Sequence, residues 1–286
     1  MFEKVLFPTD FSEYAQKTLE CIGEIPGIKE LMLLHIVDAT HPSKRGWTHG
    51  PHIENAKILM EEKKEYLESL GLKVKVKVEV ITEGEVYRTI LENANKENVS
   101  LIVMGARGKS PIKDLLLGGV STNIVRHAKT NLLIMRYKLV EGLEGNAYEK
   151  FCPLIFSKVL LPTDFSEPAG KAISFIKDIK GIEEIVLLNV VNKGETKEEI
   201  EENVKKAKEN LGDIKGELGE AGFKVKDHVR VGNPPEEIIS TAEDDNVSLI
   251  AMSPHGKGWF RELLVGSTTC AVVRRANRPV LVVRAK

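Results

Sequence analysis

The stretch KVLFPTDFSE, residues 4–13, returns with a single change as KVLLPTDFSE, residues 158–167. In both copies a short apolar run is followed by Pro-Thr-Asp, and then by a Ser-Glu pair that opens a segment of helical pattern. An apolar run that passes through a turn into a helix is how a βαβ unit begins. The repeat therefore predicts two copies of one α/β scaffold.

The composition fits two domains and excludes several classes of function. A chain of 286 residues with 42% hydrophobic content suits about two domains of ordinary size. Lys plus Arg total 41 against 42 for Asp plus Glu, so no broad cationic surface is expected and nucleic acid is not predicted as a main partner. The three cysteines, Cys21, Cys152 and Cys270, have no metal-ligand spacing, which fits a reducing compartment.

No membrane partner is predicted either. The sequence begins on a strand-like run without the pattern of a secretory signal, and no apolar stretch approaches the length that spans a bilayer. We therefore expect a soluble, cytoplasmic protein.

Each half alternates short apolar runs with longer helical patterns. In the first half we predict helices beginning near residues 12, 52, 85 and 119, between strands near 4–8, 31–37, 72–80, 100–104 and 131–136. Runs such as LMLLHIV, residues 31–37, are apolar on both faces, as parallel strands covered by helices on each side should be. The alternation therefore predicts a parallel sheet in each half.

The two copies are not of equal length. They are 154 residues apart at Asp10 and Asp164 but 148 apart at Gly108 and Gly256, so the first half carries six extra residues. We expect them in the Gly- and Pro-rich loop 38–52. Domains are predicted over residues 1–138 and 157–286, joined by a linker at 139–156 whose end, FCPLIF, is apolar enough to dock on a neighbouring surface.

A glycine-containing loop follows the fourth strand of each half. The first reads MGARGKSPIKDLLLGGVSTNIV (104–125) and the second MSPHGKGWFRELLVGSTTCAVV (252–273). Glycine lets backbone N–H groups approach a phosphate closely, and the next helix begins at Gly118 or Gly266 with its positive dipole end free. One isolated pair of glycines more often marks a turn, but two matched loops favour phosphate binding.

The GKS at residues 108–110 is not the end of a P-loop. That motif requires a glycine at the position of Val103, and the second copy, GKG, lacks the hydroxyl that would hold a metal ion.

The combination of these motifs resembles the universal stress protein family. The chain has strand-PTDFSE-helix and then Gly-x2-Gly-x9-Gly-Ser/Thr in each half, with one departure per copy, so the resemblance covers nearly everything except the linker. It implies two tandem Rossmann-like domains, each a five-stranded parallel sheet of order 3-2-1-4-5 with helices on both faces. It also implies an adenine nucleotide between strands 1 and 4, which agrees with the general rule that ligands of open α/β sheets bind at the switch point.

The resemblance also implies which residues contact the nucleotide. Asp10 would lie by the nucleoside, the Ile36 backbone by adenine, and the glycine loop around the ribose and phosphates. The first-half set is Asp10, Ile36, Met104, Gly105, Gly108, Gly118, Gly119, Val120 and Ser121; the second-half set is Asp164, Val190, Met252, Ser253, Gly256, Gly266, Ser267, Thr268 and Thr269. Gly119 replaces the expected Ser or Thr, and Ser253 replaces the expected first Gly.

Asp10 has a second interpretation. Asp10-x-x-Glu13 is similar to a helix capping box, and Ser12 could also cap the first helix. The sequence leaves both interpretations open, although the place of Asp10 at the end of the first strand favours a nucleoside contact.

Other polar residues give weaker indications. The histidines at positions 41, 49 and 52 lie in a loop without helical spacing and without counterparts in the second half, so we expect solvated residues and no metal site. His35 lies in an apolar strand and is replaced by Asn189 in the second copy, which indicates a core polar group with a satisfied hydrogen bond.

These features predict a nucleotide-binding regulatory protein of the stress response and not an enzyme. Its ligand would be ATP or AMP, with Mg²⁺ as an optional companion. Two alternatives stay open: an enzyme that hydrolyses ATP slowly, with only Arg107 and His255 as candidate groups beside the phosphates, and an interaction protein without nucleotide. The last strands, NLLIMR and PVLVVR, are expected to pair the halves as a pseudo-dimer, with a further homodimer as a second option.

Overall fold

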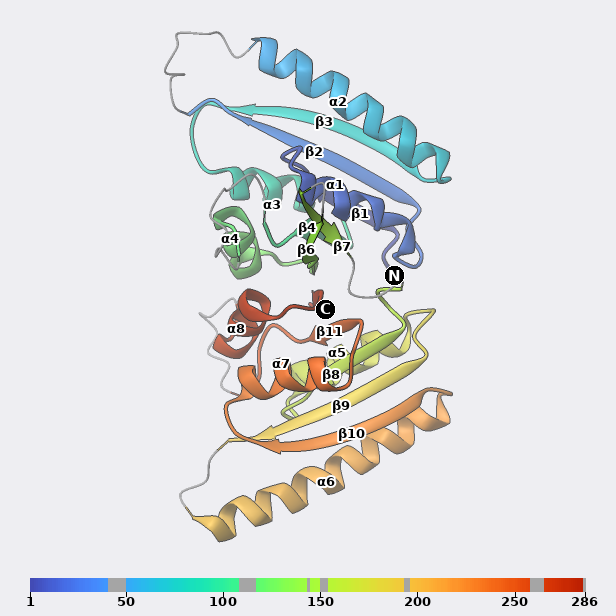
Figure 1. The fold of residues 1–286 in the computed structure, drawn as a ribbon, viewed down its shortest axis with the longest axis vertical. Coiled ribbons are helices and arrows are strands. Elements are labelled where there is room, and N and C mark those ends of the chain that lie inside the picture. Colours follow the sequence, from blue (N-terminus) through green and yellow to red (C-terminus); the bar gives the residue numbers. More distant parts are fainter. Residues whose placement is uncertain are drawn as a thin grey trace. The chain divides into compact units, whose positions relative to one another are not determined.

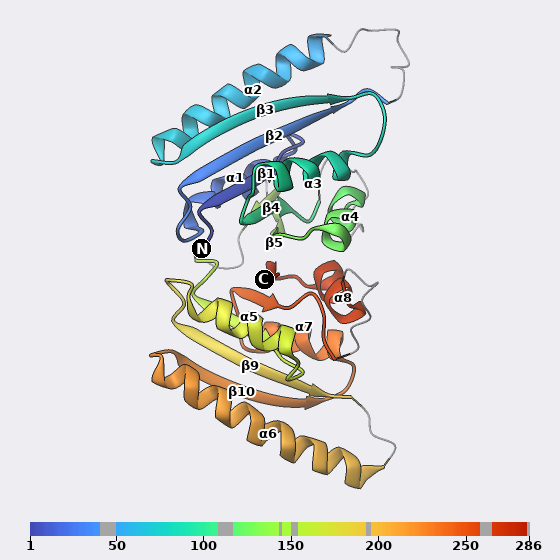
Figure 2. The same ribbon diagram turned by 180° about the vertical axis from the view of Figure 1, so that it is seen from behind.

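The computed structural model of the protein describes residues 1–40, 50–107, 117–142, 145–149, 154–192, 196–257 and 265–284. Backbone contacts divide the chain into two compact units, residues 1–132 and 133–286. Figure 1 and, from behind, Figure 2 show strands alternating with helices in each half.

The first half follows the predicted order of elements. Its strands and helices are β1 (Lys4–Pro8), α1 (Glu13–Glu20), a 3-10 turn η1 (Ile22–Glu24), β2 (Glu30–Asp38), α2 (Gly50–Ser69), β3 (Lys73–Ile81), α3 (Val86–Lys96), β4 (Leu101–Gly105), α4 (Gly119–His127) and β5 (Asn131–Met135). Each strand lies within two residues of its predicted bounds, because the apolar runs that form the core are short and sharply bordered.

The second half repeats this order. It consists of β8 (Lys158–Pro162), α5 (Glu167–Lys177), β9 (Glu184–Val191), α6 (Lys197–Glu220), β10 (Lys224–Val231), α7 (Pro234–Asp244), β11 (Leu249–Met252), α8 (Ser267–Arg275) and β12 (Val280–Val282). In both halves one long helix, α2 or α6, packs along the second and third strands (Figures 1 and 2).

Both halves have the strand order 3-2-1-4-5. The first runs β3-β2-β1-β4-β5 and the second β10-β9-β8-β11-β12, and β1 pairs in parallel with both β2 and β4. The central strands are buried throughout their middle residues, and every residue of β4 is buried. The order confirms the expected fold, and it leaves β1 and β4 as neighbours whose connections leave in opposite directions.

Helices cover both faces of the first sheet. Lys63 on α2 donates a hydrogen bond to Gln16 on α1, which joins these two helices. The Tyr87 ring of α3 stacks on the His127 ring of α4, with centroids 5.3 Å apart, which joins the other two. The two helices that follow β1 and β4 therefore belong to different layers.

The six extra residues of the first half are divided between two places. The offset between the copies is 154 at the starts of β2 and β9 (184 − 30), 151 at β3 and β10 (224 − 73) and 148 at β4 and β11 (249 − 101). Three extra residues thus lie between the start of the second strand and the start of the third, and three between the start of the third strand and the start of the fourth. The prediction of a single insertion in loop 38–52 was wrong, because the loop Ile81–Glu85 also takes up length.

The predicted linker contains paired strands. β6 (Lys138–Gly142) and β7 (Gly145–Glu149) form an antiparallel pair that runs from Lys138 opposite Glu149 to Gly142 opposite Gly145. Backbone pairing of this kind needs no buried side-chain pattern, which is why composition alone indicated an irregular segment. At the end of the linker Ile155 and Phe156 are buried, as the apolar character of that stretch predicted.

Candidate functional site

A pocket opens at the carboxyl ends of β1 and β4. Its volume is about 270 Å³, a little under the range of about 300–1,000 Å³ common for small-molecule sites. It is lined by Pro8, Thr9, Asp10, Ala15, Leu34, Ile36, Val86, Ile90, Met104, Gly105, Arg107, Gly118, Gly119, Val120 and Ser121. Eight of the nine first-half residues predicted from the sequence therefore share one cavity, and the ninth, Gly108, lies outside the described residues.

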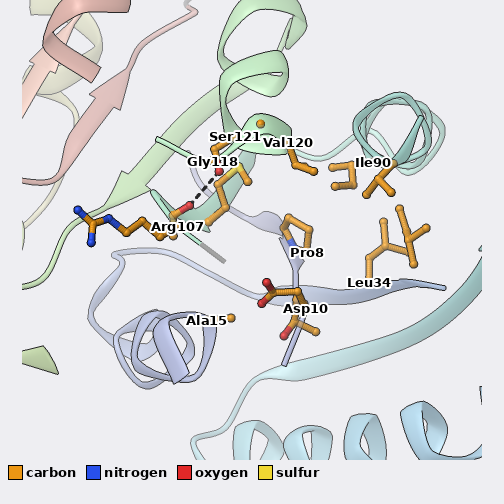
Figure 3. A pocket seen from close by; sticks show the side chains of 15 residues that line it. Pro8, Asp10, Ala15, Leu34, Ile90, Arg107, Gly118, Val120 and Ser121 are labelled. Carbon is orange, nitrogen blue, oxygen red and sulfur yellow. Dashed lines mark hydrogen bonds between the residues drawn. The ribbon is translucent and has the colours of Figure 1, made fainter. Parts of the chain in front are cut away.

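One side of the pocket is apolar. Leu34 and Ile36 are two residues apart on β2 and so point to the same face of the sheet, and Val86 and Ile90 are one helical turn apart on α3. Figure 3 shows Leu34 and Ile90 on the side of the cavity away from Arg107. Such a wall suits a flat, weakly polar group, since binding would remove its apolar surface from water.

Asp10 lies at the turn between β1 and α1. Its Oδ1 accepts a hydrogen bond from the Ser12 N–H at 3.0 Å and one from Ser12 Oγ at 2.6 Å, while Ser12 Oγ accepts from the Ala15 N–H at 3.1 Å. Ser12 is thus the N-cap of α1, and Asp10 fixes the side chain that does the capping. The capping box of Asp10 and Glu13 was wrong, since Ser12 is the N-cap and the helix begins at Glu13, two residues later than that box requires.

The turn after Asp10 is strained in both halves. Phe11 has φ 60° and its counterpart Phe165 also has φ 60°, a region that bulky side chains rarely adopt. In the first half the Thr9 Oγ1 accepts from the Phe11 N–H at 3.1 Å, and the Phe11 ring lies 4.3 Å from the His35 ring. Such outliers cluster at binding sites, where the surrounding structure holds them.

His35 is a core polar group, as its replacement by Asn189 indicated. His35 Nδ1 donates to the Thr9 carbonyl at 2.8 Å, and Asn189 Nδ2 donates to the Thr163 carbonyl at 2.8 Å. Both side chains therefore hold the turn that carries the aspartate. Of the loop histidines, His52 lies exposed in the first turn of α2, and His41 and His49 lie outside the described residues. Within the part of the chain that the structure describes, no cluster of His, Cys, Asp and Glu could hold a metal ion.

The polar end of the pocket is the beginning of α4. Gly118 is the N-cap, no side chain caps the helix, and its N–H donates to the Ala106 carbonyl at 2.9 Å, which closes the loop. The first N–H groups of a helix have no partner within it and carry the positive end of the dipole, so they can bind an anion. Arg107 lies at the rim, and Figure 3 shows its side chain extending away from the other lining residues.

The Ser121 side chain makes a hydrogen bond within the protein. Its hydroxyl is buried and donates to the Gly105 carbonyl at 3.2 Å, the bond drawn in Figure 3. In the second half Thr269 Oγ1 likewise donates to the Ser253 carbonyl at 2.9 Å. In both copies this hydroxyl ties the start of the helix to the end of the fourth strand, and its proton is already used.

Gly105 is a glycine because of packing. A Cβ built there would lie 2.6 Å from Tyr14 Cδ1 and 3.1 Å from the Arg107 carbonyl oxygen, so the ring of Tyr14 fills the space of a side chain. Its φ is not positive. The replacement of this glycine by Ser253 in the second copy therefore concerns contact with the first helix of the domain and not backbone strain.

The second half has the same constellation. Asp164 Oδ1 accepts from the Ser166 N–H at 3.1 Å, and Asp164 Oδ2 accepts from the Lys257 N–H at 2.6 Å. Gly266 is the N-cap of α8 and donates to the Pro254 carbonyl at 2.7 Å, with Ser267 exposed and Thr268 half-exposed in the first turn. Val190 and Met252 lie near the carboxyl ends of β9 and β11.

A histidine replaces the rim arginine in the second half. His255 follows β11 where Arg107 follows β4, and burial, with a smaller contribution from the Arg284 charge, holds the pKa of His255 below its usual value. The two rims thus differ in charge near neutral pH.

Seven lining residues are not among the predicted nucleotide contacts: Pro8, Thr9, Ala15, Leu34, Val86, Ile90 and Arg107. Of these, only Arg107 was identified from the sequence, as a candidate group beside the phosphates. The spacing of Val86 and Ile90, and of Leu34 and Ile36, was legible as two apolar faces. Whether these two faces line the same pocket depends on how α3 crosses β2 in the folded domain. No local sequence pattern predicts that crossing.

The fold and the paired loops define a class of α/β protein with two repeats, each a parallel sheet of order 3-2-1-4-5 whose switch point lies between its first and fourth strands. The chain belongs to the universal stress protein family, whose model matches residues 1–136 and 156–284. Universal stress protein MJ0577 of Methanocaldococcus jannaschii is 40% identical over 158 residues, which cover 46% of this chain and 98% of that protein. Universal stress protein Slr1230 of Synechocystis sp. is 28% identical over 98% of this chain and 89% of its own.

Among solved structures, a universal stress protein from Archaeoglobus fulgidus is similar along the whole chain. It has a TM-score of 0.71 at 26% identity and covers 99% of this chain and 97% of its own. Among the described residues no helix combines the length and apolar character needed to cross a membrane.

Proposed function

We propose that this protein binds adenine nucleotides, ATP or AMP, between the first and fourth strands of each half and acts as a regulatory protein of the stress response. The observation that carries the proposal is the convergence of three features in one first-half pocket. These are the Asp10 carboxylate, the uncapped start of α4 at Gly118, and the apolar wall of Leu34, Ile36, Val86 and Ile90.

Each feature matches one part of a nucleotide. The apolar wall would take the flat base, the Asp10 carboxylate would accept hydrogen bonds from ribose hydroxyls, and the N–H groups of α4 would donate to phosphate. Asp10 Oδ1 is held by Ser12, which fixes the orientation of the carboxylate before a ligand arrives. Membership of the universal stress protein family supports the same proposal.

The decisive experiment is chemical identification of what the protein carries. Purified protein is denatured, and the released small molecules are separated by chromatography and compared with ATP, ADP, AMP and GTP standards. Calorimetry then titrates nucleotide-free protein with ATP, AMP and GTP. We expect adenine nucleotides to bind and GTP to bind at least tenfold more weakly. Folded protein that binds no adenine nucleotide up to millimolar concentration would leave the interaction-protein alternative.

The pairing of the halves through their last strands stays a prediction. Covalent linkage raises the effective concentration of one half around the other, so a pseudo-dimer should persist at high dilution. Separately expressed halves that fold but neither self-associate nor bind each other would contradict it. A further homodimer would show as a doubled mass in light scattering of the full chain.

A further inference from the structure

We propose that Ser253 is a positioning residue of the second-half site, and that Pro168 is the residue that makes room for it. The inference rests on the proposed function, since the site that Ser253 orders is the nucleotide site. In the sequence pattern Ser253 is a departure, because a glycine stands at the equivalent position, Gly105. In the structure the serine performs a task that glycine cannot.

The serine hydroxyl holds the loop that follows β11. Ser253 is buried, and its Oγ donates to the His255 carbonyl at 2.6 Å, which closes a tight turn over three residues. The bond fixes the backbone just before Gly256 and Lys257.

The backbone at Gly256 and Lys257 contacts Asp164. The Lys257 N–H donates to Asp164 Oδ2 at 2.6 Å, a short hydrogen bond to a charged acceptor. A Cβ built on Gly256 would lie 2.3 Å from the same oxygen, so the glycine allows the carboxylate to approach. The Lys257 ammonium also lies 5.8 Å from the centroid of the Phe165 ring, next to Asp164 in the chain. The loop and the turn after β8 are thus joined by contacts on both sides of Asp164.

The first half shows why a serine at position 253 requires a residue other than tyrosine at the position equivalent to Tyr14. A Cβ at Gly105 would point at Tyr14 Cδ1, 2.6 Å away, and at the Arg107 carbonyl oxygen, 3.1 Å away. The carbonyl of Arg107 is the counterpart of the His255 carbonyl that Ser253 binds. The counterpart of Tyr14 is Pro168, whose compact ring sits in the first turn of α5, where proline is tolerated. The pair Tyr14 and Gly105 in the first half and the pair Pro168 and Ser253 in the second are therefore two ways of packing the same space.

The consequence is a preorganised second site. Asp164 has one oxygen on Ser166 and one on Lys257, so its orientation is set before a ligand binds. A carboxylate oxygen has a second lone pair, which leaves room for a ribose hydroxyl. Less ordering of the loop is then required on binding, and this raises affinity.

The first experiment measures loop order in the ligand-free full chain. Exchange of the Lys257 amide hydrogen is followed by NMR in the native protein, in Ser253→Ala, and in the control Ser174→Ala, an exposed serine of α5. We expect exchange at Lys257 to rise about tenfold in Ser253→Ala alone, with the urea midpoint nearly unchanged. Equal exchange in all three proteins would overturn the proposal. Partial rescue by Ser253→Thr, which restores a hydroxyl, would support it.

The second experiment tests the ligand in a Gly118→Val background, where the first site is blocked. AMP affinity should fall about three- to tenfold in Ser253→Ala and stay unchanged in Ser174→Ala. If AMP does not bind at all but exchange at Lys257 still rises, the proposed function fails and the positioning role stands. If AMP binds equally to all variants, the positioning role fails.

The third experiment introduces the second-half pair, serine and proline, at the equivalent first-half positions 105 and 14. Gly105→Ser alone should lower the urea midpoint because of the Tyr14 ring, and Tyr14→Pro alone should lower it through lost packing. The double variant should lose less than the two single losses added together. If the losses in urea midpoint were additive, the proposal that one residue pair replaces the other as a unit would be contradicted.

Discussion

At the scale of single residues, glycine positions carry most of the information about the site. Gly256 has a negative or extended φ, yet the space of its Cβ is filled by Asp164 Oδ2 at 2.3 Å. The sequence pattern attributed the glycines of these loops to phosphate contact, which stays a prediction, whereas the structure shows that neighbouring side chains take the space of the Cβ atoms at Gly105 and Gly256. Contacts between residues about 90 positions apart in the chain, such as Tyr14 with Gly105 and Asp164 with Gly256, could not be predicted from local patterns.

Gly256→Ala should therefore damage the second half. The new methyl group would force Asp164 away and break its bond to the Lys257 N–H, at a cost of about 1–3 kcal/mol in the free energy of unfolding. The control is Gly170→Ala on α5, where a Cβ would meet nothing within 4 Å and the gain in helix propensity is about 1 kcal/mol. Urea denaturation measures both. Equal stability of the two variants would contradict the contact with Asp164.

At the scale of elements, the sequence predicted strands and helices well where buried faces define them. Apolar runs located β1, β2, β4 and β5, and Ser12 and Ser166 cap α1 and α5 through the Ala15 and Ala169 N–H groups. The pair β6 and β7 was missed because backbone hydrogen bonds between adjacent strands leave little trace in composition.

The first turns of α4 and α8 differ in hydroxyl content, which predicts a difference in ligand preference. Ser267 and Thr268 begin α8 where Gly119 and Val120 begin α4. Each hydroxyl that reaches an outer phosphate contributes about 0.5–1.5 kcal/mol. We expect the second half to gain about tenfold more affinity than the first on going from AMP to ATP. Calorimetry on Gly118→Val and Gly266→Val, each leaving one site, measures the two ratios, and a larger gain in the first half would refute the argument.

An ion network at the amino ends of β1, β2 and β3 predicts how the first half responds to acid. Glu97 lies 2.9 Å from the Lys4 ammonium and also binds Lys75, and these hydrogen bonds, with Lys75 contributing most, lower the pKa of Glu97 to about 2. Because the folded pKa is depressed, the stabilisation is complete above the unfolded value of 4.5 and disappears as the pH falls towards 2.

Glu97→Gln should therefore destabilise the protein at pH 7 by about 1 kcal/mol, a modest figure because the network is partly solvated. Near pH 2 the variant and the native protein should have similar stability. Urea midpoints across this range give the comparison. Glu61→Gln on α2, an exposed pair with Lys64, serves as the control and should change little at either pH. A pH-independent difference for Glu97→Gln would rule out the charge as its cause.

At the scale of the whole molecule, the two halves share one frame but differ at the residues around the glycine loops. The strand order, the aspartate turn and the helix start are common to both, whereas Arg107 and His255, Gly105 and Ser253, and Tyr14 and Pro168 differ. The sequence predicted the shared frame because the fold requires it. It could not predict how these differences compensate for one another, because the role of Ser253 can be understood only together with Pro168.

The last prediction concerns the turnover of the nucleotide that we propose as ligand. A loose phosphoryl-transfer transition state is stabilised by metal ions, cationic groups and a placed base, and kinases that have them turn over at about 1–100 per second. In the described pocket the one carboxylate, Asp10, is bound to Ser12, and the Arg107 side chain extends away from the cavity. We expect ATP turnover far below 1 per second in either half. Radiolabelled ATP is incubated with excess protein and Mg²⁺, and the Gly118→Val/Gly266→Val double variant reports contaminating ATPase. Turnover near 1 per second that vanishes in the double variant would make the protein an enzyme, and the bound nucleotide its substrate.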